Sequence, residues 1–330
     1  MITRRKLLLA LGASTLATDL PAYAQAPKIR RIGFLAARSR SILANPEPYY
    51  EAFEQGMGKF GYVEGRTIAI EWRYADGDYA RLPGLAAELV RLNVEVLVTH
   101  GSAATQIAQK ATRTIPIVFA AANDPVGSGL AASLARPGGN ITGLAISSID
   151  VSPKHLELLK TLLPKLARIA FLANPDNSSH AAILKSVQAA ARTIGVKVLA
   201  VEARKAEDFE SAFAKMVQEK SQALIIAADA FYIGLGRQLA AIALKKRMPA
   251  IFPYREQVAA GGLMSYGQDL ANHYRLAAAY VDKILKGAKP GDLPIEQPSG
   301  IHLALNRKTA KALGLAIPQE FLLRADEVIE

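Results

Sequence analysis

Residues 94–127 read VEVLVTHGSAATQIAQKATRTIPIVFAAANDPVG, and this stretch decides the fold class. Two apolar runs in it, at 94–99 and 115–120, each have the length of a buried strand. The segment between them, 103–112, carries its apolar residues at helical spacing. A strand, a helix and a second strand in this order predict a βα unit whose two strands lie parallel in one sheet.

The same alternation extends outward from this unit. Upstream, strands are expected at 32–36 and 67–74, and helices at 49–60 and 79–92. Downstream, residues 141–145 resemble a fifth strand. The first half of the chain is therefore predicted to be one doubly wound α/β domain.

The pattern starts again in the second half of the chain. Expected helices and strands alternate from 154–163 through 169–173, 181–194, 197–201, 209–219, 223–227, 236–246 and 250–253 to 263–265. A long helix at 270–285, an extended stretch and a short helix from Arg307 follow. Because 330 residues are about twice what one domain usually takes, two similar domains are predicted. The short tail is expected to pack on one or both of them, so we expect more than one chain crossing.

Composition and charge narrow the classes of function. Apolar residues make up 51% of the chain and charged residues 21%, which excludes a disordered chain. The absence of cysteine excludes disulfides, thiolate metal sites and a cysteine nucleophile. The 40 Lys and Arg exceed the 29 Asp and Glu and give a net charge of +11. These basic residues are mostly scattered singly, without a basic stripe interleaved with aromatics, so no nucleic-acid partner is expected.

The N-terminal 24 residues follow the pattern of a secretory signal peptide. Residues 4–6 are the cationic start, 7–16 are a short apolar stretch, and Ala22-Tyr23-Ala24 is a small-x-small cleavage signal. A retained membrane anchor is the alternative, but the apolar stretch is shorter than the roughly 20 residues that a span takes. We expect export to the periplasm with cleavage after Ala24. The route is either the general one or the twin-arginine route, which the adjacent arginines resemble.

Ligands of open α/β sheets bind outside the carboxyl ends of the strands, so the residues that follow each strand are the site candidates. The third expected strand leads into Gly101, Ser102 and Ala103, whose backbone N–H groups and hydroxyl suit an anion such as a carboxylate. An ordinary helix N-cap is the alternative. The fourth expected strand is followed by Asn123 and Asp124, which place a carboxylate at the same edge. A turn is the alternative there, because Asp-Pro commonly opens one.

The second domain offers its own candidates at the same edge of its sheet. Asn174, Asp229 with Ala230, and Tyr254 each follow an expected strand. Asp229 ends a fully apolar run, where its carboxylate can pair with an ammonium group or cap the next helix. Tyr266, near the end of the last strand, can close over a ligand or pack at the hinge.

The signatures of catalysis are mostly missing. The sequence has no G-x-S-x-G elbow, no phosphate loop, no G-x-G-x-x-G after the first strand and no H-E-x-x-H. No metal and no cofactor are expected, and binding without catalysis is the more economical interpretation. The alternative is a secreted two-lobed enzyme or sensor that uses Asp124 and Asp229 across the cleft between the domains.

Several motifs together resemble one known family over essentially all of the chain after the signal peptide. They are FGYVEG (60–65), TIPIVF (114–119), DPVG (124–127), SLARPGGNITG (133–143), LELLK (156–160), AAGGLMSYG (259–267) and YVDKILKG (280–287). In these motifs the chain resembles the exported solute-binding proteins of ABC transporters. Within that family it is most similar to the branch related to tryptophan- and tyrosine-binding components, which has the type I periplasmic binding protein fold.

The resemblance implies two doubly wound, parallel-sheet lobes joined by a hinge that the chain crosses several times. The first lobe would comprise residues 28–145 plus 268–288, and the second residues 146–267 plus 289–306. The tail at 307–330 would pack on the lobes.

The resemblance also implies a function. The protein would capture a small solute, an amino acid or a related organic molecule, in the interlobe cleft and present it to an ABC permease in the inner membrane, as a monomer and without catalysis. The implied ligand-binding residues are Ala37, Gly101, Ser102, Ala103, Asn123, Asp124, Asn174, Asp229, Ala230, Tyr254 and Tyr266. The turn at 101–104 would bind a carboxylate, Asp124 and Asp229 an amino group, and Asn174 would line the opposite wall. The basic loop Arg38-Ser39-Arg40 either favours an acidic solute or faces water.

Overall fold

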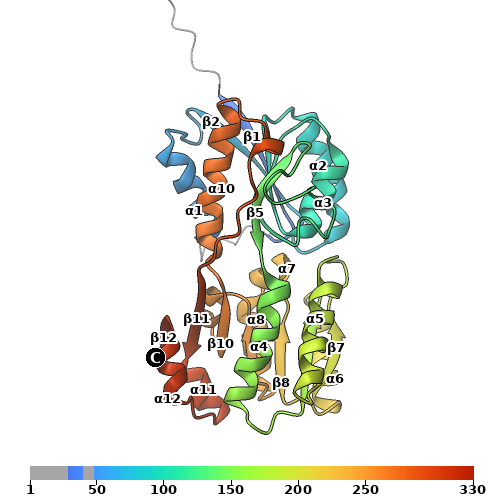
Figure 1. Cartoon of the computed structure of the whole chain (residues 1–330), viewed down its shortest axis with the longest axis vertical. Helices are drawn as coiled ribbons and strands as arrows, with labels where there is room; N and C mark the ends of the chain where they lie inside the picture. The colour runs from blue at the N-terminus through green and yellow to red at the C-terminus, as the bar shows by residue number, and fades with distance from the viewer. Residues whose placement is uncertain (1–28, 40–47) are drawn as a thin grey trace, which may run out of the picture.

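The computed structural model describes residues 29–39 and 48–330. The expected signal peptide and Arg40 lie outside these residues. Two lobes are stacked along the long axis of the molecule, and the C-terminus lies in the second lobe (Figure 1). Within the described ranges, no helix has the length and apolar character that crossing a membrane requires.

The first lobe is built on a five-stranded sheet of order β2-β1-β3-β4-β5, in which every neighbouring pair is parallel. The strands are β1 (Arg30–Ala36), β2 (Ile68–Tyr74), β3 (Val96–His100), β4 (Ile117–Asn123) and β5 (Ile141–Ile146). All residues of β3, β4 and β5 are buried, as expected of parallel strands covered on both faces.

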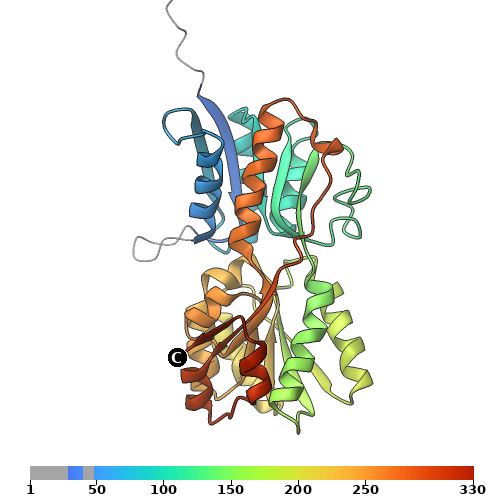
Figure 2. The same cartoon turned by 60° about the vertical axis from the view of Figure 1, so that its left-hand side comes forward.

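Helices cover both faces of this sheet. On one face lie α1 (Pro48–Lys59) and α10 (Leu270–Leu285); on the other lie α2 (Leu82–Arg91) and α3 (Ser102–Ala111). A short 3-10 helix, η1 (Tyr79–Arg81), leads into α2. Helix α10 follows residues 148–268 of the second lobe in sequence, yet it packs beside α1 in the first lobe (Figure 2).

The second lobe has a seven-stranded sheet of order β12-β11-β10-β9-β8-β6-β7. The strands are β6 (Arg168–Ala173), β7 (Lys197–Glu202), β8 (Ala223–Ile226), β9 (Ala250–Phe252), β10 (Met264–Gln268), β11 (Ile301–Asn306) and β12 (Glu327–Ile329). All neighbouring pairs are parallel except β10 and β11, which are antiparallel. The C-terminal tail thus extends the sheet of the second lobe through β12.

The helices of the second lobe also form two layers. One layer contains α4 (Ser148–Leu162) and α5 (His180–Thr193), and the other contains α6 (Asp208–Gln218), α7 (Ala230–Gly234) and α8 (Gly236–Lys245). The remaining helices are α9 (Arg255–Ala259), α11 (Arg307–Leu313) and α12 (Gln319–Arg324). The predicted fold class, two doubly wound α/β lobes, is confirmed.

The chain crosses between the lobes three times: from β5 to α4, from β10 to α10, and just before β11. One side chain joins all three crossings. The Gln268 Oε1 atom accepts a hydrogen bond from the Ser147 backbone N–H at 3.1 Å, and its Nε2 donates to the Pro298 carbonyl at 2.6 Å. The hinge is therefore a hydrogen-bonded unit rather than three independent linkers.

One expected boundary differs from the structure. Residues 289–306 were expected in the second lobe, but the segment up to Glu296, which includes the 3-10 helix η2 (Pro290–Asp292), lies on β5 of the first lobe. There the Thr142 hydroxyl donates to the Leu293 carbonyl at 2.8 Å, and the Ala145 N–H donates to the Glu296 carbonyl at 2.8 Å. An extended segment carries no periodicity that tells which sheet edge it joins, so the expected assignment of these residues to the second lobe had no local pattern behind it.

Candidate functional site

The carboxyl ends of the first lobe's strands form one side of the candidate site. Gly101 follows β3, has φ +86°, and is the N-cap of α3. The Asn123 N–H, at the end of β4, donates to the Ser102 hydroxyl oxygen at 3.0 Å. A Cβ placed on Gly101 would lie 3.6 Å from the Cβ of Ala230 in the second lobe. The two lobes therefore touch at this turn, where Ala103 is half-buried.

On the second lobe, Asp229 follows β8 and is the N-cap of α7. Its Oδ1 accepts a hydrogen bond from the Phe231 N–H at 3.0 Å, and the residue is only 2% exposed. Asn177 Nδ2 donates to Oδ2 at 2.8 Å, and Asn174 Nδ2 lies 3.5 Å from Oδ1. Asp229 therefore does cap α7, which is one of the two roles that the sequence left open. The cap uses Oδ1, so Oδ2 is available to other partners.

Hydrogen bonds connect the two lobes across the cleft. The Tyr79 hydroxyl of the first lobe donates to Asp229 Oδ2 at 3.0 Å. Asn123 Nδ2 lies 3.4 Å from the Ser179 hydroxyl, which in turn donates to Asn177 Oδ1 at 2.8 Å. We call these five residues, Tyr79, Asn123, Asn177, Ser179 and Asp229, the interlobe network.

The buried carboxylate of Asp229 is surrounded by neutral donors. His180 Nε2 lies 3.7 Å from Asp229 Oδ2. However, His180 Nδ1 accepts the Asn174 N–H at 2.9 Å, so the ring proton sits on Nε2, which donates to the Ala228 carbonyl at 3.1 Å. Within the part of the chain that the structure describes, no Lys or Arg pairs with Asp229. A buried carboxylate without a cation is suited to a cationic ligand group.

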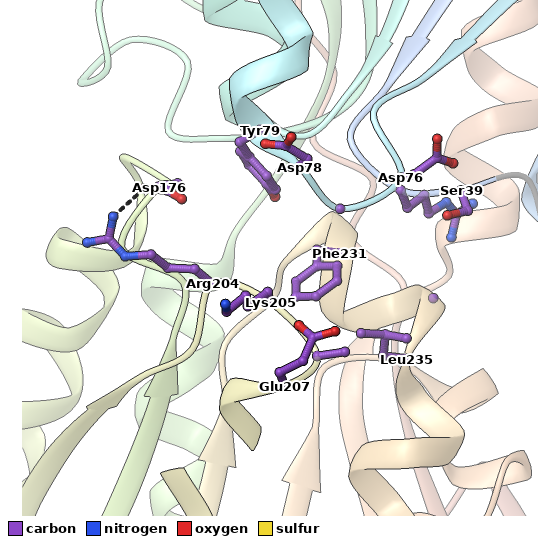
Figure 3. A pocket seen from close by; sticks show the side chains of 14 residues that line it. Ser39, Asp76, Asp78, Tyr79, Asp176, Arg204, Lys205, Glu207, Phe231 and Leu235 are labelled. Carbon is purple, nitrogen blue, oxygen red and sulfur yellow. Dashed lines mark hydrogen bonds and ion pairs between the residues drawn. The ribbon is translucent and has the colours of Figure 1, made fainter. Parts of the chain in front are cut away.

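Next to this network is a cavity of about 560 Å³, in the range of small-molecule sites (Figure 3). The first lobe contributes Arg38, Ser39, Asp76, Gly77, Asp78 and Tyr79, and the second contributes Asp176, Arg204, Lys205, Ala206, Glu207, Phe231, Gly234 and Leu235. Arg204 pairs with Asp176 at 3.2 Å on one wall. The cavity therefore lies between the lobes and combines an aromatic surface with charges of both signs.

Arg38 of the basic loop is 1% exposed. Its Nε donates to the Tyr50 hydroxyl at 3.1 Å, and its guanidinium carbon lies 4.7 Å from the ring centroids of both Tyr49 and Tyr50. Burial, with the charges of Arg38 and then His273, holds the pKa of His100 well below its usual range. Of the two alternatives for the basic loop, Arg38 thus faces the protein interior and the cavity rather than water.

Two expected tyrosines lie on the hinge side of the cleft. Tyr254 and Tyr266 line a small cavity of about 20 Å³ together with His155. The Tyr266 carbonyl accepts a hydrogen bond from His155 Nε2 at 2.6 Å. Burial, followed by the charges of Glu256 and Asp229, raises the pKa of Tyr254. Tyr254 therefore lies close enough to Asp229 for the carboxylate charge to affect the pKa of its hydroxyl, whereas Tyr266 packs at the hinge.

Asp124 and Ala37 occupy the edges of the site. Asp124 is exposed, with φ +40°, and its Oδ1 accepts the Gly127 N–H at 2.8 Å, which is a turn contact. The structure does not bring its carboxylate into the interlobe network. Ala37 is buried, and its carbonyl accepts the Gly77 N–H at 2.8 Å, so it anchors the turn that carries Tyr79.

The ligand-binding residues expected from the sequence did not include Tyr79, Asn177 or Ser179. Tyr79 was expected only as the start of a helix, although applying the strand-end rule to β2 would have selected the turn at 76–79. Across the described ranges, no group of three or more His, Cys, Asp or Glu is placed to hold a metal ion.

Comparison with known proteins places the chain in a family. Residues 47–329 match the family described as ABC transporter substrate binding protein. A "Tyrosine-binding protein" of Clostridioides difficile (strain R20291) is 27% identical over 266 residues, which are 80% of this chain and 76% of the relative.

Two solved structures share the fold closely. A conserved domain protein from Vibrio cholerae has a TM-score of 0.83 and 29% identity, covering 91% of this chain and 100% of its own. An ABC domain from Streptococcus pneumoniae in complex with L-Trp has a TM-score of 0.81 and 26% identity, with the same coverage of 91% and 100%. The chain thus belongs to the ABC transporter substrate-binding proteins, and it is a receptor for a small solute with the type I periplasmic binding protein fold.

Proposed function

We propose that the protein is an exported receptor for a small solute that carries both an amino group and a carboxylate, such as an amino acid or a related molecule. It captures the solute between its lobes and presents it to an ABC permease in the inner membrane. The names of two relatives support this substrate class, since one is a tyrosine-binding protein and another was solved with L-Trp. Export rests on the signal-peptide pattern, with cleavage after Ala24.

The observation that carries the proposal is the setting of Asp229. This carboxylate is 2% exposed, is reached by a donor from the opposite lobe, and has only neutral partners among the described residues. An ammonium group of the solute in contact with Asp229 would supply the missing positive charge through a charge-assisted hydrogen bond. Asp229 is therefore the proposed amine site.

The turn from Gly101 to Ala103 is the proposed carboxylate site. It opens α3, no side chain of the described residues caps its N-terminus, and it lies against Ala230 of the second lobe. The first N–H groups of a helix and the positive end of its dipole favour an anion. The lobes thus divide the solute's two charges between them. Ala37, Asn123, Asn174 and Tyr254 are proposed to wall the site.

Closure follows from these divided contacts. A solute that touches Asp229 on one lobe and the Gly101 turn on the other binds the closed form more tightly than the open form. Each 1.4 kcal/mol by which the solute prefers the closed form shifts the equilibrium towards closure about tenfold. A charge-assisted contact on each lobe contributes about 1.5–3 kcal/mol. The permease would then recognise the closed shape.

We further propose that the protein works as a monomer and that no bond is made or broken. The competing idea, an acid–base pair of Asp124 and Asp229, has little support, because Asp124 is exposed and engaged in a local turn. The matched family and the named relatives are binding proteins rather than enzymes.

A thermal-shift screen with matched solute pairs tests the proposal. L-tryptophan is compared with indole-3-propionate, and L-tyrosine with 3-(4-hydroxyphenyl)propionate, so that each pair differs only in the amino group. A solute at 100 times its dissociation constant adds about 2.7 kcal/mol to the stability of the folded protein. Stabilisation by amino acids but not by their deaminated partners supports the proposal. Equal stabilisation within each pair, or stabilisation by sugars instead, would refute it.

A further inference from the structure

Tyr79 stands between the large cavity and the buried carboxylate of Asp229. Its side chain lines the cavity, and Figure 3 shows it reaching from the first lobe into the space between the lobes. Its hydroxyl donates to Asp229 Oδ2 at 3.0 Å. A solute in the cavity therefore meets the Tyr79 phenol before it meets Asp229.

The acceptor positions of Asp229 are all in use. Each carboxylate oxygen has about two lone-pair sites. Oδ1 accepts from the Phe231 N–H at 3.0 Å and faces Asn174 Nδ2 at 3.5 Å, while Oδ2 accepts from Asn177 Nδ2 at 2.8 Å and from Tyr79 at 3.0 Å. An additional donor can bind only when one of these partners leaves.

Among these four donors, only Tyr79 belongs to the first lobe. Phe231 donates through its backbone in the cap of α7, and Asn174 and Asn177 are buried in the second lobe beside Asp229. Separation of the lobes removes the Tyr79 hydroxyl and leaves the other three donors in place. The partner that can be exchanged is therefore Tyr79.

The local structure holds Tyr79 in this position. The Asp78 carboxylate accepts the Ala80 N–H at 3.0 Å and caps η1, and the Gly77 N–H donates to the Ala37 carbonyl at 2.8 Å. Burial, and then the charge of Asp229, raises the pKa of Tyr79 well above its ordinary value, so the hydroxyl keeps its proton and remains a donor.

We propose that Tyr79 is a specificity-determining residue whose hydroxyl occupies the place of the solute's ammonium group and fastens the empty lobes together. This proposal rests on Asp229 as the amine site. The phenol gives the buried carboxylate a hydrogen bond but no compensating charge, whereas an ammonium group gives both, so an ammonium group displaces the phenol. A sugar hydroxyl exchanges one neutral donor for another and gains little. Tyr79 thus makes the site select for cations.

The substitution Tyr79→Phe tests the fastening role without any solute. Small-angle X-ray scattering of the empty protein should give a larger radius of gyration for Tyr79→Phe than for the wild type, because the interlobe hydrogen bond is lost. Tyr62→Phe is the matched control, since Tyr62 lies within the first lobe, where burial and then the charge of the buried Asp282 raise the pKa of its hydroxyl. Indistinguishable scattering of Tyr79→Phe and the wild type would overturn the proposal.

Calorimetry with L-tryptophan and L-tyrosine tests the competition. Removing the competing hydroxyl should tighten amino-acid binding by Tyr79→Phe about tenfold and leave Tyr62→Phe unchanged, as expected for one hydrogen bond to a charged group. Unchanged or weaker binding by Tyr79→Phe overturns the inference. Asp229→Ala separates the two ideas: if it binds amino acids like the wild type, the proposed amine site itself fails. If it loses binding while Tyr79→Phe does not bind more tightly, only the role of Tyr79 fails.

Discussion

Two turns of the molecule invite comparison, the one after β4 in the first lobe and the one after β8 in the second. Each follows a buried apolar strand, and each places an aspartate at the carboxyl end of its sheet. Asp124 is exposed and accepts one local hydrogen bond, from Gly127. Asp229 is 2% exposed and gathers donors from three chain segments, including the opposite lobe. A position at a strand end makes a residue a candidate for the ligand site, but its tertiary contacts decide its role.

The sharpest test of this comparison replaces each aspartate by alanine. Asp229→Ala should weaken binding of the best amine-bearing solute about a hundredfold, since a hydrogen bond to a charged group is worth about 1.5–3 kcal/mol. Asp124→Ala should change it less than about twofold, as expected of a surface change. Isothermal titration calorimetry measures both, with thermal unfolding as the check on folding. Equal losses of affinity in the two variants would show that the two aspartates do not differ in their role in binding.

The next largest effect is expected at Gly77 of the first lobe, which packs against Phe231 of the second lobe. Gly77 has φ +86°, and a Cβ there would lie 2.5 Å from the Phe231 ring of the second lobe. Gly77→Ala should therefore oppose closure and weaken solute binding about thirtyfold, the equivalent of about 2 kcal/mol of overpacking.

Gly65→Ala is the matched control for Gly77→Ala. Gly65 has φ +75°, with nothing within 4 Å of its added Cβ, so it carries the same backbone strain without the interlobe clash. The Gly65→Ala variant should be less stable than the wild type, while its affinity for the solute in calorimetry stays constant. A comparable loss of affinity in both variants would mean that strain, rather than contact between the lobes, is responsible.

A smaller effect on binding is expected from changing Ser179, whose hydroxyl bridges the two lobes. Ser179 connects Asn123 of the first lobe to Asn177, which holds Asp229. Ser179→Ala should weaken solute binding about fivefold, the value of one neutral hydrogen bond of about 1 kcal/mol. Ser186→Ala also removes a partly buried hydroxyl contact, to the Ile149 carbonyl, but one that lies wholly within the second lobe. If titrations find the same change of affinity in both variants, the bridge does not couple the lobes.

Most of the regular elements could be predicted from the sequence because their apolar runs have the lengths of strands and helices. The start of α4 could not. It was expected at residue 154, but the helix begins at Ser148 and contains Pro153. A proline inside a helix removes one N–H donor and frees a carbonyl. The Ser186 hydroxyl donates to that carbonyl, of Ile149, at 2.9 Å, a contact that no local pattern reveals.

The short elements were also beyond a search based on periodicity. Helices α7 and α9 have five residues each and β12 has three, which is too few for a recurring apolar pattern. Strand β12 exists only because the end of the chain pairs with β11. Such elements depend on tertiary contacts rather than on a local sequence pattern.

The site was predictable in outline and not in detail. The strand-end rule selected Gly101, Asn123, Asn174 and Asp229, which the structure brings to the interlobe contact. Tyr79 was missed because the rule was not applied to the turn after β2, and the sequence does not show its partner, since the Tyr79–Asp229 hydrogen bond joins residues 150 positions apart. Hydrogen bonds between distant segments depend on how two lobes meet, and no local spacing encodes this.

The placement of α10 has a consequence for the order of assembly. This helix shares a core with α1 and β1 in the first lobe, yet the ribosome makes it only after strands β6 to β10. Until α10 emerges, the face of the first sheet that carries Phe34 and Val98 has no complete cover. A nascent chain ending at β10 should thus expose an apolar surface to chaperones, and the first lobe would stay incomplete until most of the second has been made.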